Sequence, residues 1–464
     1  MNIELRIDND KEILLSPIKK NNEAADANIF ELFDENNKSW MELRLINNSF
    51  EIIGKDILII DSDDDLRIKL DKLVLEVIEA EQSGTESTES TLTEEASPYN
   101  PDNIKVHSKQ FSIKLIDEMI DNGDIDFTPD YQRNFVWNSL QKSRLIESIL
   151  LRIPLPMFYF SEDEDGKISV VDGLQRLTTI KEFMDNKFPL KNLEYLKDSC
   201  EGKYYTAKEK NGELNGKPCI DAKYLRWFNM TQFSVNVIDP NSPPKVKYDI
   251  FRRINTGGKP LNNQEIRNSL AGRGLRDTVK EMVSLKEFKV ATDYSIKPTR
   301  MDDQEVALRF VLFYNLHSED PTINNYSGYM DSSLDDLTEN LSKTRNTDLE
   351  KYVRLFSNSM QNAEYLFGSR HAFRKVILHD IKPNAYKQLI NKALFVCWSV
   401  LLADFDPEII KSKNPIKGLL EPLATIIEND MKLWGYLSYG TNSKANLLYV
   451  FAECKKLINQ HLIY

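Results

Sequence analysis

Cysteine and long apolar runs are scarce in this chain of 464 residues. Its four Cys, at positions 200, 219, 397 and 454, form no CxxC pair, so no zinc site or redox dithiol is indicated. Reduced thiols in a cytosolic protein are the expectation. No stretch reaches the roughly 18 uninterrupted apolar residues of a transmembrane helix, so no membrane contact is expected. The start, MNIELRIDNDKE, lacks the basic and apolar pattern of a secretory signal, which favours a cytoplasmic location.

The net charge of −12 is distributed unevenly along the chain. Residues 1–103 contain 10 Lys and Arg against 25 Asp and Glu, a balance of −15, and the remaining residues contain 50 against 47, a balance of +3. Because local basic patches matter more than the total charge, the acidic total does not exclude nucleic acid as a partner. The hydrophobic content of 41% and the charged content of 28% are those of a globular protein.

Four segments with different patterns follow one another. Residues 1–78 contain short Ile-, Leu- and Val-rich runs such as NIELRI, WMELRLI and LRIKLDKLVLEVI, which predict strands and a small all-β domain. Residues 79–103 are rich in Glu, Ser and Thr, which predicts a disordered acidic linker. Residues 104–274 mix helix and strand patterns, and residues 275–464 are mostly amphipathic helix. The expected fold class is an α+β multidomain protein with an α-helical C-terminal domain.

Local signals place the elements of the middle segment. SIKLIDEMIDN is a predicted helix that stops at Gly123, and Asn138 or Ser139 is the expected N-cap of the next helix. PMFYF and ISVVD are predicted to form a β-hairpin with Asp165 and Gly166 in the turn. A further helix, LQRLTTIKEFMDNK, begins directly after ISVVDG.

The most informative motif is VVDGLQRLTTI, residues 170–180, where the predicted strand passes into the predicted helix. Gly173 allows a ligand to approach the backbone, and the free N–H groups of the helix start suit an anion. Gln175 and Arg176 in the first turn can add contacts to phosphate, and Asp172 can hold Mg²⁺ or orient a water. The alternative is an ordinary strand–turn–helix with Asp172 as the cap and Arg176 in a surface ion pair.

A second motif is FTPDYQRNFVW, residues 127–137. Aromatic rings next to Gln132 and Arg133 can stack on a base and bond to its edge. The alternative is a loop held in a core by Tyr131 and Trp137.

A third motif is YDIFRRINTGGKPLNNQEIRN, residues 248–268. Successive N–H groups in a Gly-Gly turn form a concave anion site, and Asn262 and Glu265 have the spacing of a capping box for the helix that follows. The alternative is a helical hairpin with Gly at a C-cap. Positive charge is expected on both sides of the turn, from Arg252, Arg253 and Arg267.

These motifs, with LIESILLRIPLPMFYF between them, closely resemble domain-of-unknown-function family 262 over roughly residues 105–275. That family includes the N-terminal part of GmrSD-type modification-dependent restriction systems and is distantly similar to the ParB/sulfiredoxin fold. A weaker resemblance continues through RMDDQEVALRF, INKALFVCWSVLLA and YGTNSKANLLYVF. The resemblance implies a ParB/sulfiredoxin-like nucleotide-binding domain, often NTP-hydrolysing with Mg²⁺, in a restriction or antiphage defence system. It also implies DNA and a separate nuclease or effector protein as partners, and self-association through the helical half.

The resemblance assigns roles to individual residues. The family's Asp-Gly-Gln-Gln-Arg signature at the phosphates is matched by Asp172, Gly173, Gln175 and Arg176. Asp172 is then the metal ligand, and the catalytic residues are Asp172, Arg176 and Gln132. The block that lines the same pocket is matched by Tyr131, Gln132 and Arg133. The second phosphate-side loop is matched by Asn255, Thr256, Gly257 and Gly258, with Arg253 beside it.

Two departures from the family pattern bear on activity. Leu174 stands where the family usually has its first Gln and cannot supply an amide contact, which affects turnover or base preference rather than binding. Restriction members often carry an HNH-type nuclease half, but the five His of this chain complete no such metal site. His371 is expected at the surface or at a helix cap, and His317 and His461 at helix ends. No nuclease is therefore expected in the C-terminal half.

Two other functions stay open. A ParB-like pocket could hold a nuclease metal with Asp172, Asp130 and Glu147, although Glu147 also fits a solvated helix face with a local ion pair to Arg144. A non-enzymatic regulator is the other alternative, in which the acidic region 1–103 covers a basic groove that binds DNA or a partner. The nucleotide hypothesis itself requires that the turn at Asp172 and the loop near Gly257 lie together in the fold.

Overall fold

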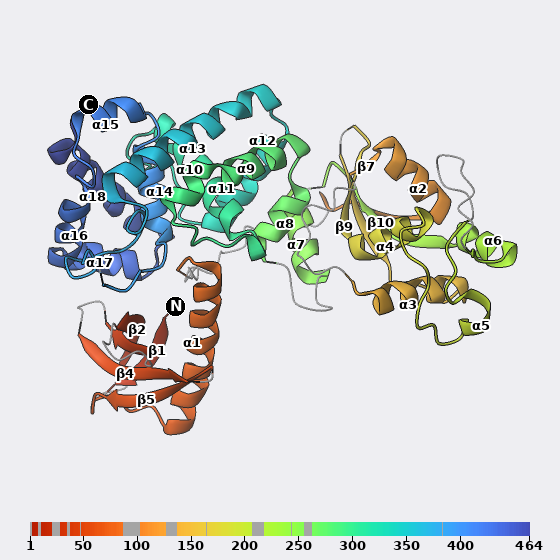
Figure 1. Cartoon of the computed structure of the whole chain (residues 1–464), viewed down its shortest axis with the longest axis horizontal. Coiled ribbons are helices and arrows are strands. Elements are labelled where there is room, and N and C mark those ends of the chain that lie inside the picture. Colours follow the sequence, from red (N-terminus) through yellow and green to blue (C-terminus); the bar gives the residue numbers. More distant parts are fainter. Residues whose placement is uncertain are drawn as a thin grey trace. The chain divides into compact units, whose positions relative to one another are not determined.

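The computed structural model of the chain describes all residues except 1, 8–10, 21–27, 35–37, 47, 87–102, 127–136, 164, 207–217, 243, 255–261 and 383. The chain forms two compact units (Figure 1). One unit combines residues 1–95 with residues 272–464, and the other consists of residues 96–271. The first and last segments of the sequence therefore share one unit, and the middle segment forms the other.

The N-terminal part is an antiparallel sheet with its five strands in sequence order. Alternation explains the strands, since Ile3 and Leu5 are buried while Glu4 between them is exposed. This confirms the all-β sheet expected for the first segment. Its strands are β1 (Ile3–Ile7), β2 (Lys11–Lys20), β3 (Ile29–Phe33), β4 (Ser39–Ile46) and β5 (Ser49–Lys55).

Residues 66–78, which the sequence pattern predicted as a strand, lie instead in helix α1 (Asp63–Ser83). The Ser62 side chain accepts the N–H of Asp65, and acidic residues fill the first turn at the positive end of the helix dipole. The buried positions recur every three or four residues, which is the period of a helix and not of a strand. Within 66–78 they are Leu66, Leu70, Leu73, Val74 and Val77.

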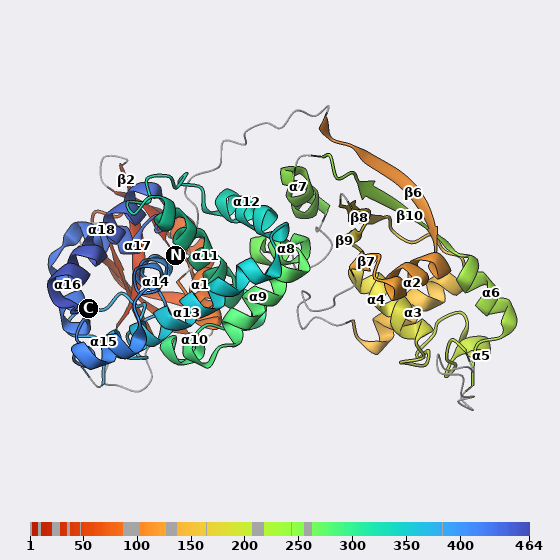
Figure 2. The same cartoon turned by 90° about the horizontal axis from the view of Figure 1, so that it is seen from above.

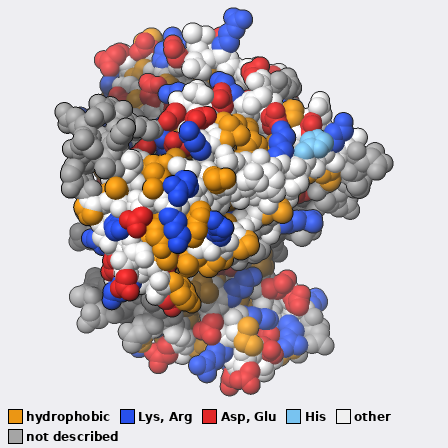
Figure 3. Space-filling model, turned by 90° about the vertical axis from the view of Figure 1, so that its right-hand side faces the viewer, with side chains coloured by type: hydrophobic (Ala, Val, Ile, Leu, Met, Phe, Trp, Pro, Cys, Tyr) orange, Lys and Arg blue, Asp and Glu red, His pale blue; other side chains and the backbone are white. Residues whose placement is uncertain are grey.

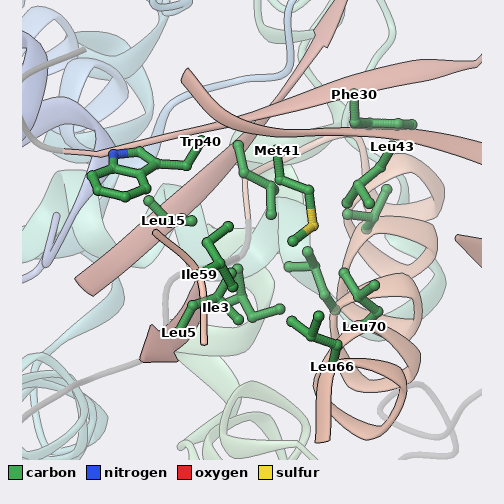
Figure 4. Packing of buried hydrophobic residues seen from close by; sticks show 13 residues of the cluster. Ile3, Leu5, Leu15, Phe30, Trp40, Met41, Leu43, Ile59, Leu66 and Leu70 are labelled. Atoms are coloured by element: carbon green, nitrogen blue, oxygen red, sulfur yellow. The ribbon is translucent and has the colours of Figure 1, made fainter. Parts of the chain in front are cut away.

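The core of this part lies between the sheet and α1. Figure 4 shows the leucines of α1 facing side chains of the sheet. Full burial of such a side chain contributes about 1.5–3 kcal/mol. The sheet residues of the cluster include Leu15, Phe30, Met41 and Leu43.

The first residues of the segment 79–103, which was predicted as a disordered linker, are folded. Helix α1 continues to Ser83, and Gly84 follows in a left-handed conformation with φ of +79°. A Cβ at Gly84 would lie 1.9 Å from the carbonyl oxygen of Ser295, so only glycine fits this close approach. The N–H of Glu86 donates to the carbonyl of Ile390 (2.9 Å), which ties residues 84–86 to the helical part. Residues 87–102 lie outside the described part.

The middle unit contains a mixed sheet in the order β6-β10-β8-β9-β7. Strand β8 pairs antiparallel with β9 and parallel with β10, so the hairpin predicted around Gly166 and the α/β character are both confirmed. The strands are β6 (Val106–Ser112), β7 (Ile125–Asp126), β8 (Phe158–Glu162), β9 (Ile168–Asp172) and β10 (Gln232–Ile238).

The helices of the middle unit begin and end where their caps predict. Gly123 ends α2 in a left-handed conformation, and Asn138 forms a capping box with Gln141 at the start of α3. The helices are α2 (Ile113–Asn122), α3 (Ser139–Leu150), α4 (Leu174–Met184), α5 (Lys197–Cys200), α6 (Ala222–Met230), α7 (Pro244–Ile254) and α8 (Asn263–Leu270).

Residues 272–464 are helical, as expected, with α9, α11 and α13 side by side (Figures 1 and 2). Membrane crossing requires a long apolar helix, and the described residues contain none that qualifies. The helices are α9 (Arg273–Ser284), α10 (Lys286–Ala291), η3 (Pro298–Arg300), α11 (Asp302–Glu319), α12 (Met330–Ser342), α13 (Asn346–Phe367), α14 (Lys392–Leu401), α15 (Pro407–Lys413), α16 (Leu420–Asn429), α17 (Met431–Ser438) and α18 (Lys444–His461).

Candidate functional site

The turn between β9 and α4 depends on a glycine. Gly173 has φ of +99°, a left-handed conformation that side chains with a Cβ rarely adopt. A Cβ built on it would lie 2.3 and 2.7 Å from two ring carbons of Phe158. Gly173 is also the N-cap of α4, and it supplies no side-chain cap to the N–H groups of the first turn. The turn therefore presents the start of an 11-residue helix with its backbone donors uncapped by a side chain.

Asp172 and Arg176 form an ion pair across this turn. The distance between Asp172 Oδ2 and Arg176 Nη2 is 2.7 Å. The Asp172 side chain is 37% exposed and the Arg176 side chain 12% exposed, so the carboxylate is at the surface while the guanidinium is held beneath it. Asp172 does not cap α4, contrary to the alternative interpretation of the sequence, but the ion pair of that interpretation is present.

Three further contacts fix the Arg176 guanidinium. Its Nη1 donates to the carbonyl of Pro156, and its Nη2 donates to the carbonyl of Met157 (3.2 Å). Its central carbon lies 4.2 Å from the centroid of the Phe158 ring, within the range of a cation–π contact. Burial lowers the pKa of Arg176, and the charge and hydrogen bond of Asp172 oppose that shift. The cation therefore sits in a rigid frame at the end of the strand.

The next two residues of the motif have different roles. Leu174 is buried at 5% exposure in the core under α4, so the position where the family has its first Gln does not face solvent here. Gln175 is partly exposed in the first turn, and its carbonyl accepts the Thr179 hydroxyl (2.8 Å).

Helices α7 and α8 pack beside the same strand. A hydrophobic cluster joins Val171 of β9 with Tyr248 of α7 and Ile266 of α8. The two helices that flank residues 255–261 therefore lie next to the strand that ends at Asp172, as the nucleotide hypothesis requires of them. The predicted capping box of Asn262 and Glu265 is present.

The arginines beside this loop are arranged differently from the prediction. Arg253 is exposed in the last turn of α7, and Arg252 contacts Asn263 (3.2 Å) and Asp249 (3.5 Å). Arg267 was expected to add positive charge beside the loop, but its side chain is buried at 1% exposure. Its place on the inner face of α8 is a tertiary property that the charge pattern does not show.

Several predicted site residues lie outside the described residues. They are Asp130, Tyr131, Gln132 and Arg133 of the second motif, and Asn255, Thr256, Gly257 and Gly258 of the third. Of the predicted set, the structure brings Asp172, Gly173, Gln175 and Arg176 together at the start of α4, with Arg253 on a helix that packs beside β9.

Glu147 is a structural residue and not a ligand at a solvated face. Its residue exposure is 2%, and its carboxylate accepts the N–H groups of Glu194, Tyr195 and Leu196 at 2.7–3.0 Å. Burial raises its pKa, but the three backbone donors outweigh this and the net shift is downward. The solvated face expected for Glu147 is therefore wrong, whereas its expected ion pair with Arg144 is present (3.8 Å). Its carboxylate is taken up by the three backbone donors, which disfavours a role as a nuclease ligand. Across the described residues, no group of three or more His, Cys, Asp or Glu is placed to hold a metal ion.

The histidines were predicted in part. His317 lies in the last turn of α11 and His461 ends α18, as expected. His371 was expected at the surface or at a helix cap but is 7% exposed and lies after Gly368, the C-cap of α13, where the chain folds back into the helical core.

Sequence reasoning missed an aromatic and cationic cluster on α6. The Arg152 guanidinium lies 4.2 Å and the Lys223 amine 4.6 Å from the centroid of the Trp227 ring. Tyr224 lies edge-on to Trp227 with 5.7 Å between the centroids. The signal was present in the sequence as AKYLRW, residues 222–227, but only the fold brings Arg152 to it.

No curated protein matches the chain. The family described as "GmrSD restriction endonuclease, N-terminal domain" matches residues 116–271, which is 156 of the 464 residues. This range contains the Gly173 turn, Asp172 and Arg176, α6 and the helices α7 and α8. The resemblance predicted from the sequence blocks is confirmed: residues 116–271 match the GmrSD restriction endonuclease N-terminal domain, which links this chain to restriction systems.

Proposed function

We propose that residues 96–271 are the nucleotide-binding module of a restriction or antiphage defence system, which binds the phosphates of an NTP at the start of α4 and hydrolyses it with Mg²⁺. The observation that carries this proposal is the turn at Gly173, where uncapped helix donors, a carboxylate and a guanidinium meet. The match to a restriction endonuclease domain supplies the biological context.

The helix start is suited to a phosphate for two reasons. Its backbone N–H groups and the positive end of the helix dipole favour an anion. The absence of a Cβ at Gly173 lets an oxygen approach the backbone where a side chain would stand. Gln175 in the first turn adds an amide beside the same donors.

The ion pair supplies the remaining chemistry. Asp172 Oδ2 is bonded to Arg176 (2.7 Å), and the Asp172 side chain is 37% exposed. Mg²⁺ is commonly held by one or two carboxylates together with substrate phosphates, so Asp172 fits as its protein ligand, and the ion would supply charge stabilisation at the phosphoryl group. Arg176 stays anchored by the Pro156 and Met157 carbonyls, and a phosphate oxygen would accept from its Nη2 in place of Asp172 Oδ2. Gln132, Tyr131 and Arg133 complete the pocket in this proposal.

The second wall of the pocket would come from α7 and α8. Their packing on Val171 keeps both ends of the segment 255–261 near β9. In the proposal, Asn255, Thr256, Gly257 and Gly258 contact the phosphates from this side, and Arg253 contributes charge.

We also propose that the middle unit is a ParB/sulfiredoxin-like domain. A mixed sheet with helices that follow β9 and β10 is consistent with a ParB/sulfiredoxin-like domain. That likeness is the basis for expecting a ligand at the strand–helix turn rather than elsewhere in the unit.

DNA is the proposed macromolecular partner, with α6 as the contact surface. This helix lies at one end of the unit in both views (Figures 1 and 2). Lys and Arg side chains lie among hydrophobic ones on the face of the molecule shown in Figure 3. Cations over Trp227 and Tyr224 can pair with phosphates while the rings contact bases or sugars. A separate nuclease or effector protein would then act on the bound DNA, and the helical part could support self-association.

The test is phosphate release by the purified full-length chain from each of the four NTPs, with and without Mg²⁺. The wild type should release phosphate from at least one NTP, and Asp172→Ala and Arg176→Ala should each lose this activity. The matched control is Arg273→Ala, because Arg273 pairs with Asp277 in the same i,i+4 arrangement on an exposed face outside the middle unit. Equal release by wild type and both site variants would refute the hydrolase proposal.

Two related functions are separated by added measurements. Nucleotide binding without release, lost in Asp172→Ala, would indicate a nucleotide-controlled switch. Plasmid nicking lost in the same variant would support the ParB-like nuclease alternative, which has only Asp172 as a described candidate ligand now that Glu147 is engaged elsewhere. The regulator alternative cannot be tested cleanly by deletion of residues 1–103, because this would remove α1 from the unit that it shares with the helical part.

A further inference from the structure

The unit formed by residues 1–95 and 272–464 contains a cavity of about 550 Å³ between its sheet and its helical part. Its walls come from β2, β3 and α1 on one side, and from α16, α17 and the segment 375–389 on the other. This volume is in the range of pockets that bind small molecules. No residue of the proposed nucleotide site contributes to it.

Each of two lysines in the wall lies over an aromatic ring. The Lys375 amine lies 4.4 Å from the centroid of the Trp434 ring and donates to the Ser438 hydroxyl (2.8 Å). The Lys19 amine bonds to Glu81 (2.6 Å) and lies 5.1 Å from the centroid of the Tyr386 ring. The lysines are therefore held in fixed positions along apolar walls.

Glu86 and Lys375 place an acceptor and a donor together on this wall. Both side chains are enclosed by protein yet partly accessible, because they face the cavity. Burial raises the pKa of Glu86 and lowers the pKa of Lys375, and each group partly opposes the shift of the other through its charge. The Glu86 carboxylate is oriented by the Asn391 amide, which donates to it. Asn391 is fully buried and also bonds to the Leu437 carbonyl (2.8 Å), so this arrangement is rigid.

The charge of the wall limits which chemical classes of ligand the cavity can bind. Acidic residues outnumber lysines, with Glu81, Glu86, Asp380 and Glu428 against Lys19 and Lys375. Such a wall repels a polyphosphate, and its carboxylates accept hydrogen bonds from a ligand that donates them. Aromatic walls favour a flat ring.

We propose that this cavity binds an uncharged planar nitrogen heteroaromatic ring with donors and acceptors side by side on one edge, which is the chemistry of a guanine or cytosine base. The Glu86 carboxylate accepts the N–H donors of the ring edge, and the Lys375 ammonium donates to the neighbouring acceptor, which is O6 of guanine or N3 of cytosine. Aromatic side chains of the wall contact the ring. The site is separate from the proposed nucleotide site and does not depend on it.

The test is equilibrium dialysis of the full-length chain against guanosine, cytidine and purine riboside without Mg²⁺. Purine riboside is the matched ligand, because it has the same ring system as guanosine but no exocyclic amine or carbonyl. Guanosine or cytidine should bind saturably, and purine riboside should bind at least about tenfold more weakly. Glu86→Gln keeps the size of the side chain and should weaken binding at least about tenfold, because one acceptor becomes a donor.

Trp434→Leu should weaken binding to a similar extent. Its matched control is Tyr436→Leu on the same helix, since Tyr436 packs on Tyr449 and does not line the cavity. If Trp434→Leu does not fold, the isosteric Glu86→Gln variant decides alone. The double variant Asp172→Ala, Arg176→Ala should bind as the wild type does, which separates this cavity from the nucleotide site.

Two results would overturn the proposal. One is the absence of saturable binding of guanosine and cytidine up to about 1 mM. The other is binding that Glu86→Gln leaves unchanged or that Asp172→Ala abolishes. A second arm uses a short single-stranded oligonucleotide: competition with the bound nucleoside indicates a base presented by nucleic acid, and no competition indicates a free nucleoside as the source.

Discussion

The substitution Gly173→Ala tests the geometry on which the candidate site depends. The left-handed conformation at φ of +99° costs an alanine about 1–2 kcal/mol. The new methyl group would also lie 2.3 Å from a ring carbon of Phe158, whose side chain is fully buried. Relief of such overpacking in a core costs typically about 1–3 kcal/mol. The expected loss of stability in the middle unit is therefore about 2–5 kcal/mol.

Gly166→Ala is the matched control for the backbone contribution. Gly166 has φ of +80°, and a Cβ there would meet no atom within 4 Å. This variant should cost only about 1–2 kcal/mol, so the difference between the two variants measures the contact with Phe158. The double variant Gly173→Ala, Phe158→Leu should recover part of that difference, since the smaller side chain relieves the clash.

The assay is hydrogen exchange by mass spectrometry on the full-length chain, read at the amides of β8, β9 and α4. This local measurement is needed because a chain with two units does not unfold in a single step. Equal losses for Gly173→Ala and Gly166→Ala would refute the tight packing of Phe158 under the turn. In that case the rigid frame proposed for Arg176 would also lose its support.

Three other predictions concern the fold. Glu147→Gln should destabilise the middle unit by about 2–3 kcal/mol, because a charged acceptor of three backbone donors is lost. The pKa of Glu147 is lowered in the folded state, so the stability that its carboxylate contributes is present above the unfolded pKa and is lost as pH falls through the folded pKa. Hydrogen exchange measured across acidic pH should show this loss in the wild type and not in Glu147→Gln. Leu70→Ala should cost about 2–5 kcal/mol, read by hydrogen exchange at the amides of β3 and β4, and unchanged protection there would contradict the packing of α1 on the sheet. Burial raises the pKa of Asp302 from 3.8 to about 6, so its carboxyl lowers stability as pH rises through this range. Asp302→Asn should reduce that fall in the hydrogen-exchange protection of α11 measured below and above this pH, and parallel pH profiles would contradict the burial.

Much of the middle unit was predictable because its signals are local. The caps at Gly123 and Asn138, the hairpin turn at Gly166 and the capping box at Asn262 each depend on residues within a few positions. The strand–glycine–helix order at residue 173 is a signal of the same kind. The helical pattern of residues 275–464 was also clear, because long amphipathic helices repeat their signal many times.

The remaining features depend on contacts between residues distant in the sequence. The run at 66–78 suits either a strand or a helix by composition, and packing on the sheet selects the helix. The charge pattern predicted exposed positions for Glu147 and Arg267, but the fold buries both.

By itself, the sequence determined the strand–glycine–helix turn, the acidic first segment and the resemblance to a restriction-system domain. Only the tertiary structure decided that Phe158 lies under Gly173 and Arg176, and that Glu86 and Lys375 share the wall of a cavity. The physical reason is the separation in sequence of the residues that interact. Capping and turn formation involve residues a few positions apart, whereas burial and ion pairing involve segments that meet only in the folded chain.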